Sequence, residues 1–339
     1  MLSNQIATSN IKMKTYQQLW QSLTPLYDAD EAQAIVRTVL DVKYGMTLTD
    51  IICGKVNEIS ADEERKLEEI IIRLQKGEPV QYVLGEADFA GRTFHVEPGV
   101  LIPRPETAEL CQWIEKDMIE KSIVSSGDSS EDSSGNSPQA TDDAKLILDI
   151  CTGSGCIAIT LGLNIPNSEV TGWDISEDAL RIAQGNVEML KARNVRIEYQ
   201  DALALPKAAE TDNEKMKVTA DKEVVKSKGE AKTPSTQKWD MIVSNPPYIC
   251  EKEKADMEKN VLEHEPSLAL FVPDENPLKF YRAIAEYASS ALKPEGALYF
   301  EINPIYEKET REMLLKLDFK DIETKEDAFG KKRMMRAIK

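Results

Sequence analysis

The chain has 339 residues, which is enough for two domains or for one large domain with insertions. Its formal net charge of −17 argues against a free-standing DNA- or RNA-binding protein, because lysine and arginine supply most of the affinity for phosphates. The five cysteines form no Cys-x-x-Cys pair and only two histidines occur, which disfavours disulfide frameworks, metal sites and Ser-His-Asp hydrolases.

The amino-terminal segment lacks the apolar core of a signal peptide, and no stretch approaches the roughly 18 apolar residues of a membrane span. We therefore expect a soluble cytoplasmic protein with reduced thiols, without a metal, and without direct binding to membranes or nucleic acids.

Residues 1–78 have the pattern of a small helical domain. Its clearest helix begins at a capping box formed by Ser60 and Glu63, and apolar residues follow at helical spacing. Residues 79–102 are instead rich in aromatic residues and valine and contain three glycines, which predicts a β-hairpin connector.

Residues 103–339 alternate between apolar strand-like runs and helical patterns, which predicts a mostly parallel sheet covered on both faces. Two more strands are expected to close the chain as an antiparallel hairpin. The expected strands are Leu146–Ile150, Val170–Asp174, Val195–Tyr199, Met241–Ser244, Leu298–Ile302, Asp321–Glu326 and Arg333–Ile338. Residues 125–143 and 207–238 are polar and lack apolar anchors, and we expect flexible surface insertions there.

A glycine-rich turn, Thr152–Gly155, follows the first of these strands. Such a turn lets the backbone approach a ligand and points free N–H groups of the next helix toward it. Asp174 ends the following strand, where a carboxylate can accept hydrogen bonds from ribose hydroxyls, although a capping or turn role is an alternative. Asp201 follows the third strand and is a candidate contact for adenine, or a turn residue. These features fit a dehydrogenase and a methyltransferase equally well.

The sequence Asn245-Pro246-Pro247-Tyr248 after the fourth strand favours a methyltransferase over a dehydrogenase. The prolines stiffen the turn and lack N–H donors, so the Asn245 side-chain oxygen and the Pro246 carbonyl can each accept one N–H of an –NH2 group. Tyr248 can pack against the flat face of that group. Two converging acceptors orient an amide-type nitrogen for methyl transfer and favour the charge that builds on it. We therefore expect Asn245, Pro246 and Tyr248 to act in catalysis.

The residues 265–271 that follow are expected to lie over the site or to serve the fold alone. By this point the chain resembles the HemK family of bacterial peptide-chain release factor glutamine methyltransferases. The resemblance spans nearly the whole chain outside the two insertions and is carried by Pro79–Tyr82, Pro103–Thr107, the glycine turn, Asp174, Asn245–Tyr248, Glu265–Phe271 and Asp327–Arg333.

The resemblance implies an α/β fold of the class I S-adenosylmethionine-dependent methyltransferases, with a seven-stranded sheet and an amino-terminal helical domain that helps to hold the substrate. It implies transfer of a methyl group to the glutamine of the Gly-Gly-Gln motif in class-1 peptide chain release factors. The expected contacts to S-adenosylmethionine are Cys151, Thr152, Gly153, Ser154, Gly155, Asp174, Asp201, Ala202 and Asn245, and the expected contacts to glutamine are Asn245, Pro246, Pro247 and Tyr248.

Two positions depart from the family pattern. Ala202 stands where an aromatic residue often follows the acid of the third strand, and Ala108 stands where a second glutamate often follows Thr107. Two alternative substrates stay open. One is a glutamine of a ribosomal protein, and the other is the amino group of a flipped-out nucleic-acid base, which suits the same acceptor turn.

Overall fold

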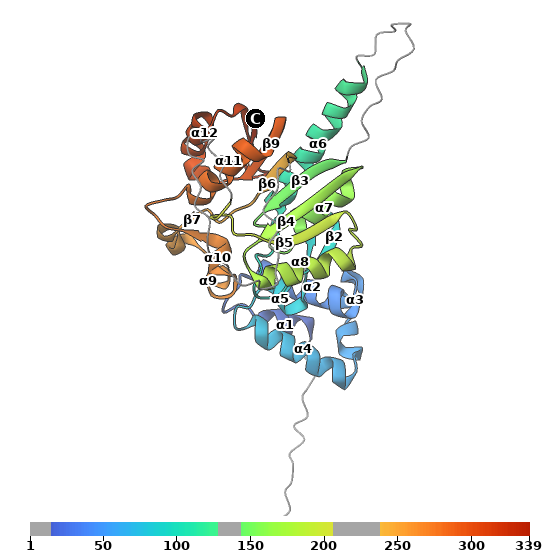
Figure 1. The fold of residues 1–339 in the computed structure, drawn as a ribbon. Helices are drawn as coiled ribbons and strands as arrows, with labels where there is room; N and C mark the ends of the chain where they lie inside the picture. The colour runs from blue at the N-terminus through green and yellow to red at the C-terminus, as the bar shows by residue number, and fades with distance from the viewer. Residues whose placement is uncertain (1–14, 128–143, 206–237) are drawn as a thin grey trace, which may run out of the picture. The chain divides into compact units, whose positions relative to one another are not determined.

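The computed structural model describes residues 15–127, 144–205 and 238–339, and these divide into two compact units (Figure 1). The first comprises residues up to Glu86 together with Val96–Pro98 and Met257–His264, and the second comprises the rest. The two predicted insertions lie outside the described residues, except for residues 125–127, which end a helix, and Lys238.

The first unit is helical, as the sequence indicates. Its core is formed by apolar residues of several helices, including Leu40, Leu67 and Ile71. The Ser60–Glu63 capping box is present in both directions and begins the helix α4. The elements are α1 (Tyr16–Gln21), α2 (Ala29–Tyr44), α3 (Leu48–Ile52), η1 (Lys55–Glu58), α4 (Ala61–Leu74), α5 (Val80–Leu84) and, later in the chain, α9 (Lys259–His264).

Two boundaries differ from those expected. The predicted connector over 79–102 begins with helix α5, and only then forms the hairpin of β1 (Glu86–Phe89) and β2 (Arg92–His95). Val83 and Leu84 are buried in the helical core, and Gly85, with a φ of 79°, ends the helix in the left-handed conformation. Helix α9, expected within the methyltransferase domain, clusters with the helical unit instead.

The second unit contains a seven-stranded sheet in the order β10-β11-β9-β6-β3-β4-β5, which confirms the predicted fold class. The strands β5, β4, β3, β6 and β9 are parallel, whereas β11 is antiparallel to both β9 and β10. The bounds are β3 (Lys145–Ile150), β4 (Ser168–Asp174), β5 (Val195–Tyr199), β6 (Trp239–Ser244), β9 (Leu292–Glu301), β10 (Lys320–Glu326) and β11 (Lys332–Ile338).

Helices cover both faces of this sheet. Side chains that alternate along one strand enter separate cores, so Ile147 packs with α6 (Pro105–Gly127) and α7 (Cys156–Asn164), and Leu148 packs with α11 (Lys279–Ala291) and α12 (Glu307–Lys316). The remaining elements are α8 (Glu177–Met189), η2 (Glu251–Asp256), α10 (Ser267–Leu270), η3 (Pro304–Tyr306) and the short parallel pair β7 (Ile249–Cys250) and β8 (Phe271–Val272).

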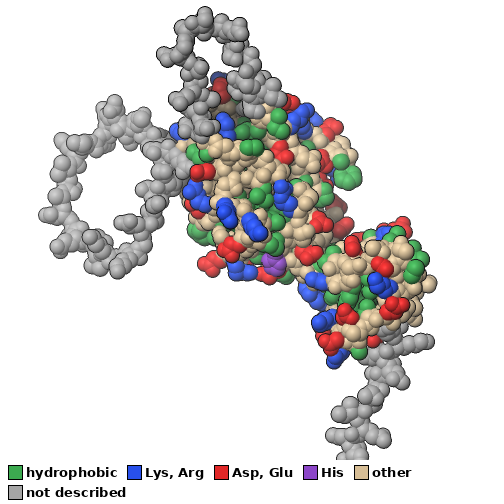
Figure 2. Space-filling model, turned by 90° about the vertical axis from the view of Figure 1, so that its right-hand side faces the viewer, with side chains coloured by type: hydrophobic (Ala, Val, Ile, Leu, Met, Phe, Trp, Pro, Cys, Tyr) green, Lys and Arg blue, Asp and Glu red, His purple; other side chains and the backbone are tan. Residues whose placement is uncertain are grey.

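Acidic and basic side chains are interspersed over the face shown in Figure 2. None of the helices within the described ranges combines the length and the apolar character that crossing a membrane requires.

Two helical glycines of the second unit predict opposite effects of the same substitution. A Cβ on Gly162 of α7 would lie 2.6 Å from Cγ2 of Val195 in β5, whereas a Cβ on Gly185 of α8 would meet nothing within 4 Å. We expect Gly162→Ala to lower the free energy of unfolding by about 1–3 kcal/mol through overpacking, and Gly185→Ala to raise it by about 0.5–1 kcal/mol through helix propensity. Urea unfolding of both variants tests this, and equal effects of the two would contradict it.

Candidate active site

The carboxyl ends of four parallel strands meet at one edge of the sheet. Ile150 of β3 lies opposite Trp173 of β4 and Ser244 of β6, and Asp174 lies opposite Tyr199 of β5. The residues that follow these strands therefore converge on one pocket within the second unit, which is where open α/β sheets bind ligands. Predicted site residues that line it are Cys151, Thr152, Gly153, Ser154, Asp174, Asp201, Ala202, Asn245 and Pro247.

Three predicted residues, Gly155, Pro246 and Tyr248, are not among the lining residues. Gly155 is required for a different reason. Its φ is 81°, and a Cβ there would lie 3.1 Å from Ile159 and 3.2 Å from Ala183, so the glycine lets α7 approach α8. Gly153 also has a positive φ, of 55°, but a Cβ there would meet nothing within 4 Å, so the turn leaves open space beside its backbone.

A buried carboxyl group, Asp149, supports the glycine turn from β3. Its Oδ2 accepts hydrogen bonds from the Thr152 hydroxyl at 2.6 Å and from the Ala158 N–H at 3.2 Å. Its Oδ1 has no hydrogen-bond partner in the described chain. Burial raises the pKa of Asp149 to about 7, against the effect of those two hydrogen bonds. The proton therefore stays on this group at acidic pH, where exposed carboxyl groups have lost theirs.

Asp174 ends β4 beside the glycine turn. One of its carboxylate oxygens accepts from the Gly153 N–H at 2.9 Å, and the other accepts from the Ser176 N–H at 2.9 Å. Burial raises the pKa of Asp174, and these backbone donors oppose the rise. The cap of α8 is Ser176, which accepts from the Ala179 N–H, so Asp174 is not needed as the cap. Each carboxylate oxygen keeps a lone pair for a further donor.

Asp201 begins the turn after β5 and also lines the pocket. Its carboxylate accepts from the Leu203 N–H at 2.8 Å, so the turn role and the lining role occur in the same residue. Ala202 is buried beside it, and its methyl group presents no aromatic face to the pocket.

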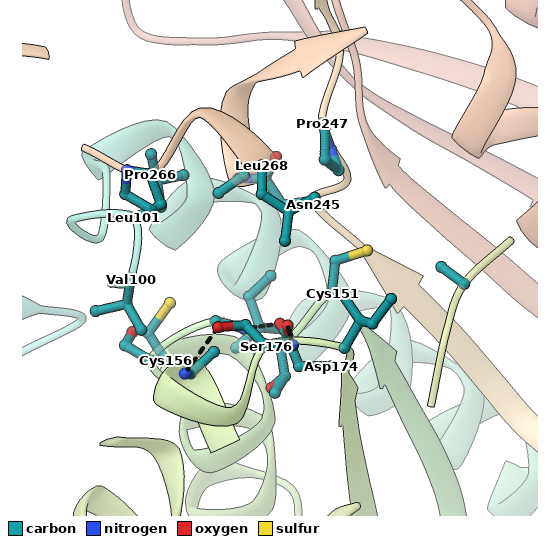
Figure 3. Close-up of a pocket in the computed structure, with 18 of the residues that line it drawn as sticks. Val100, Leu101, Cys151, Cys156, Asp174, Ser176, Asn245, Pro247, Pro266 and Leu268 are labelled. Carbon is teal, nitrogen blue, oxygen red and sulfur yellow. Dashed lines mark hydrogen bonds between the residues drawn. The ribbon is translucent and has the colours of Figure 1, made fainter. Parts of the chain in front are cut away.

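The Asn245–Tyr248 turn leaves β6 on the side of the pocket opposite Asp174 and Ser176 (Figure 3). Asn245 is half-buried, and its Nδ2 donates to the Thr107 hydroxyl at 3.1 Å. Pro246 and Pro247 are both buried. The Tyr248 hydroxyl donates to Glu301 at 2.9 Å, and the Asn303 side chain donates to the Tyr248 carbonyl at 3.1 Å. The turn is therefore held from several neighbouring elements.

The segment Glu265–Phe271 supplies Pro266, Leu268 and Ala269 to the pocket wall, which agrees with the expectation that it lies over the site. Glu265 is 5% exposed and pairs with Arg104 while accepting from the Ile102 N–H at 3.2 Å. This ion pair, buried at Glu265 and half-buried at Arg104, joins two pocket walls that are 161 residues apart in sequence.

Sequence reasoning from the strand-end pattern did not identify Arg104, Thr107 or Phe280, which also line the pocket. Arg104 and Thr107 entered only through the resemblance carried by Pro103–Thr107. Glu301 was not identified at all. The signal that could have identified Glu301 is an acidic residue near the end of an otherwise apolar strand.

The raised pKa of Asp149 predicts a specific dependence of stability on pH. The Asp149 carboxyl group releases its proton near pH 3.8 in the unfolded chain and near pH 7 in the folded chain, so the folded state binds more protons between these two pH values. Relative to Asp149→Asn, the wild type should therefore be most stable below about pH 4 and lose ~1–4 kcal/mol of this advantage as the pH rises from about 4 to about 7. Denaturant unfolding across this range measures the difference, and a constant difference would contradict the assignment.

Comparisons with known proteins identify the family to which the chain belongs. Residues 141–313 match a family described as "Methyltransferase domain", and residues 21–85 match the "PrmC N-terminal domain". The chain is 42% identical over 317 residues to the release factor glutamine methyltransferase of Bacteroides thetaiotaomicron, covering 94% of this chain and 96% of the relative.

A second relative is the release factor glutamine methyltransferase of Flavobacterium psychrophilum, which is 35% identical. The match covers 96% of this chain and 98% of the relative. Among solved structures, the human methyltransferase 10 domain containing protein is 15% identical, with a TM-score of 0.44. The match covers 83% of this chain and 98% of that chain. The identity and coverage of the two bacterial relatives show that the chain is an S-adenosylmethionine-dependent methyltransferase and belongs to the release factor glutamine methyltransferase family.

Proposed function

We propose that this enzyme transfers the methyl group of S-adenosylmethionine to the side-chain amide nitrogen of the glutamine in the Gly-Gly-Gln motif of class-1 release factors. The observation that carries the proposal is that Asn245, a residue suited to an –NH2 group, lines the same pocket as Asp174 and the glycine turn. The names of the bacterial relatives support a release factor as the acceptor. We also propose that the reaction takes place in the cytoplasm, where thiols stay reduced.

The chain's own residues fit the cofactor. Asp174 offers a carboxylate for the ribose hydroxyls, held in place by the N–H groups of Gly153 and Ser176. The open space beside Gly153 lets the rest of S-adenosylmethionine lie close to the backbone. In this proposal Asp201 and Ala202, which also line the pocket, contact the adenine ring. S-adenosylmethionine supplies an electrophilic methyl group on a sulfonium centre.

The turn Asn245–Tyr248 positions the amide nitrogen of the substrate. An amide nitrogen is a poor nucleophile because its lone pair is delocalised, and it becomes more acidic as the methyl group arrives. The Oδ1 of Asn245 and the carbonyl of Pro246 accept its two N–H bonds, which aligns the nitrogen and stabilises the positive charge that develops on it. A proton leaves the nitrogen after transfer, so no strong base is needed beforehand.

Of the turn Asn245–Tyr248, only Asn245 and Pro247 line the pocket. In this proposal the incoming glutamine amide reaches past the lining residues to the Pro246 carbonyl, and the ring of Tyr248 packs against the amide plane. The buried prolines keep the carbonyl in a fixed direction.

Two alternative acceptors are tested directly. A ribosomal protein could present a glutamine to the same turn, and a flipped-out base could present an exocyclic amine. The net charge of −17 disfavours the nucleic acid. When the enzyme is incubated with methyl-labelled S-adenosylmethionine and each acceptor separately, we expect label only in the release factor, on the Gly-Gly-Gln glutamine. Label in ribosomal proteins or DNA, with none in release factors, would refute the proposal.

Replacement of the acceptor residue should separate chemistry from cofactor binding. We expect Asn245→Ala to lower kcat by a factor of about 100–1,000, because one of two groups that stabilise the transition state is lost. The dissociation constant for S-adenosylmethionine, measured by calorimetry, should stay within a few-fold of the wild-type value. Normal methylation by this variant would exclude Asn245 as the acceptor.

The reciprocal control is Asp174→Ala. Loss of the ribose contact should weaken the binding of S-adenosylmethionine by a factor of about 10 or more, because a charge-assisted hydrogen bond contributes about 1.5–3 kcal/mol. Unchanged affinity in calorimetry would remove Asp174 from the cofactor site.

A further inference from the structure

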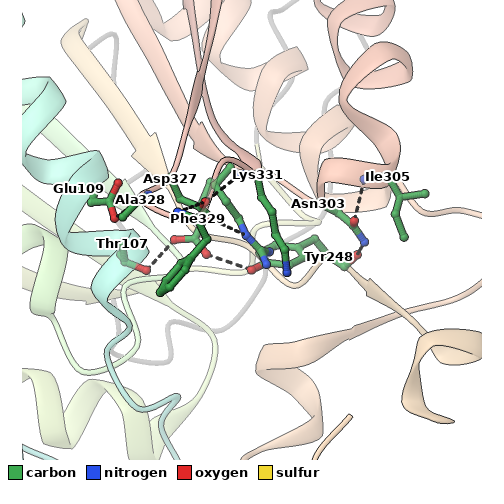
Figure 4. A network of polar contacts seen from close by, with 11 residues as sticks. Thr107, Glu109, Tyr248, Asn303, Ile305, Asp327, Ala328, Phe329 and Lys331 are labelled. Atoms are coloured by element: carbon green, nitrogen blue, oxygen red, sulfur yellow. Dashed lines mark hydrogen bonds and ion pairs between the residues drawn. The ribbon is translucent and has the colours of Figure 1, made fainter. Parts of the chain in front are cut away.

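A buried carboxylate at the end of β9 binds the acceptor turn, Asn245–Tyr248. Glu301 is only 2% exposed, and its two oxygens bind different parts of the site. Its Oε2 accepts from the Thr107 hydroxyl at 2.6 Å, and its Oε1 accepts from the Tyr248 hydroxyl at 2.9 Å (Figure 4). A buried charge is a costly way to hold a turn, since well-packed apolar side chains give equal or better stability. The arrangement therefore points to a role in addition to stability.

The direction of the hydrogen bonds follows from counting protons. The Thr107 hydroxyl has one proton, and an ionised carboxylate can only accept, so this proton points to Glu301. The Thr107 oxygen is then left as an acceptor, and the group 3.1 Å away on Asn245 must be the donor, Nδ2. The opposite end of the amide, Oδ1, is consequently the end left for a substrate. The chain Glu301–Thr107–Asn245 thus sets which end of the asparagine is presented.

Burial raises the pKa of Glu301 above its usual value, and the negative charge of Glu106 adds to this rise. The hydrogen bonds from Thr107 and Tyr248 and the positive charge of Arg333 act in the opposite direction and stabilise the ionised carboxylate. Arg333 is itself held by an ion pair with Asp327, at 3.3 Å. A negative charge behind the acceptor turn also favours the positive charge that develops on an amide nitrogen during methyl transfer.

We propose that Glu301 is a positioning residue for methyl transfer, which acts through the Thr107 hydroxyl to present the Asn245 oxygen to the substrate amide and through the Tyr248 hydroxyl to orient that ring. This inference rests on the proposed function, because it assigns a purpose to the orientation of Asn245. Glu301 itself is not among the residues that line the pocket. It acts only through the two residues to which it is bonded.

The test compares the isosteric variant Glu301→Gln with the wild type. The amide keeps only one acceptor oxygen, so its –NH2 group must face either the Thr107 or the Tyr248 hydroxyl, and one of the two bonds that Glu301 accepts is lost. Where the –NH2 group donates to Thr107, the Thr107 proton is free to bond the Asn245 oxygen, and Nδ2 turns toward the substrate. We expect kcat on a release factor to fall by a factor of about 100, as when one preorganised group of a transition-state site is lost. The dissociation constant for S-adenosylmethionine should change by no more than a few-fold.

Thr107 provides an independent pair of variants. Thr107→Val removes the hydroxyl and keeps the shape, so it should lower kcat to a similar extent. Thr107→Ser keeps the hydroxyl and should retain most of the activity. The double variant with Glu301→Gln should be no slower than the slower single variant, because both act on the same asparagine. This pair also decides the question if Glu301→Gln folds poorly.

Tyr281→Phe is the matched control for a purely structural role. The Tyr281 hydroxyl is buried and also bonds Glu301, but it donates to the backbone carbonyl, at 3.2 Å, and not to the carboxylate. It accepts from the Asn303 N–H at 3.0 Å, so its loss should lower the melting temperature. We expect kcat within a few-fold of wild type.

The outcomes separate the two proposals. Near-wild-type kcat in Glu301→Gln or Thr107→Val, or an equal loss of kcat in Tyr281→Phe, would overturn the positioning role while leaving the proposed function intact. A wild-type enzyme that methylates no release factor would instead overturn the proposed function.

Discussion

The parallel register of β4, β3 and β6 determines which residues meet at this site. Because Ile150 is opposite both Trp173 and Ser244, the chain leaves all three strands at the same level of the sheet. The glycine turn, Asp174 and Asn245 are thereby brought together although they are separated by up to about 90 positions in sequence. No single helix or loop arranges them; their meeting follows from strand pairing and from the buried apolar faces that fix it.

Around that edge, a few buried polar groups convert a sheet edge into a shaped site. Asp149 supports the glycine turn from below, the Glu265–Arg104 pair joins two walls, and Glu301 ties the start of α6 to the acceptor turn. Each of these groups carries a desolvation cost, and each is matched by hydrogen bonds that satisfy most of its atoms. The unpaired Oδ1 of Asp149 is the exception, and it agrees with a carboxyl group that keeps its proton to about pH 7.

Much of the fold was predictable because its signals are local. Near-continuous apolar runs predicted the strands of the sheet, and the Ser60–Glu63 capping box predicted where α4 begins. Helix α5 was not predicted, since Val80–Leu84 has the composition of a strand and becomes helical through burial of Val83 and Leu84 in the helical core. The grouping of α9 with the first unit depends on contacts distant in sequence, which no local pattern records.

The site shows the same division. Thr152–Ser154 and Asn245 follow strands and Asp174 ends one, and they were predicted from these positions; the structure places them around one pocket. Gly155 was expected to contact the cofactor, and its surroundings show instead a glycine needed for contact between α7 and α8. Glu301 was missed because its partners, Thr107 and Tyr248, are 194 and 53 residues away along the chain. Only the folded sheet brings a strand-end acid behind the acceptor turn.

In the proposed reaction the Asn245 oxygen receives an amide N–H of the substrate. The most direct measurement is a crystal structure of the enzyme with S-adenosylhomocysteine and a release factor bound. We expect the glutamine side-chain nitrogen within about 3 Å of both Asn245 Oδ1 and the Pro246 carbonyl oxygen, with Asn245 Nδ2 still bonded to the Thr107 hydroxyl. A glutamine amide bound away from this turn, or an Asn245 whose Nδ2 faces the substrate, would contradict it.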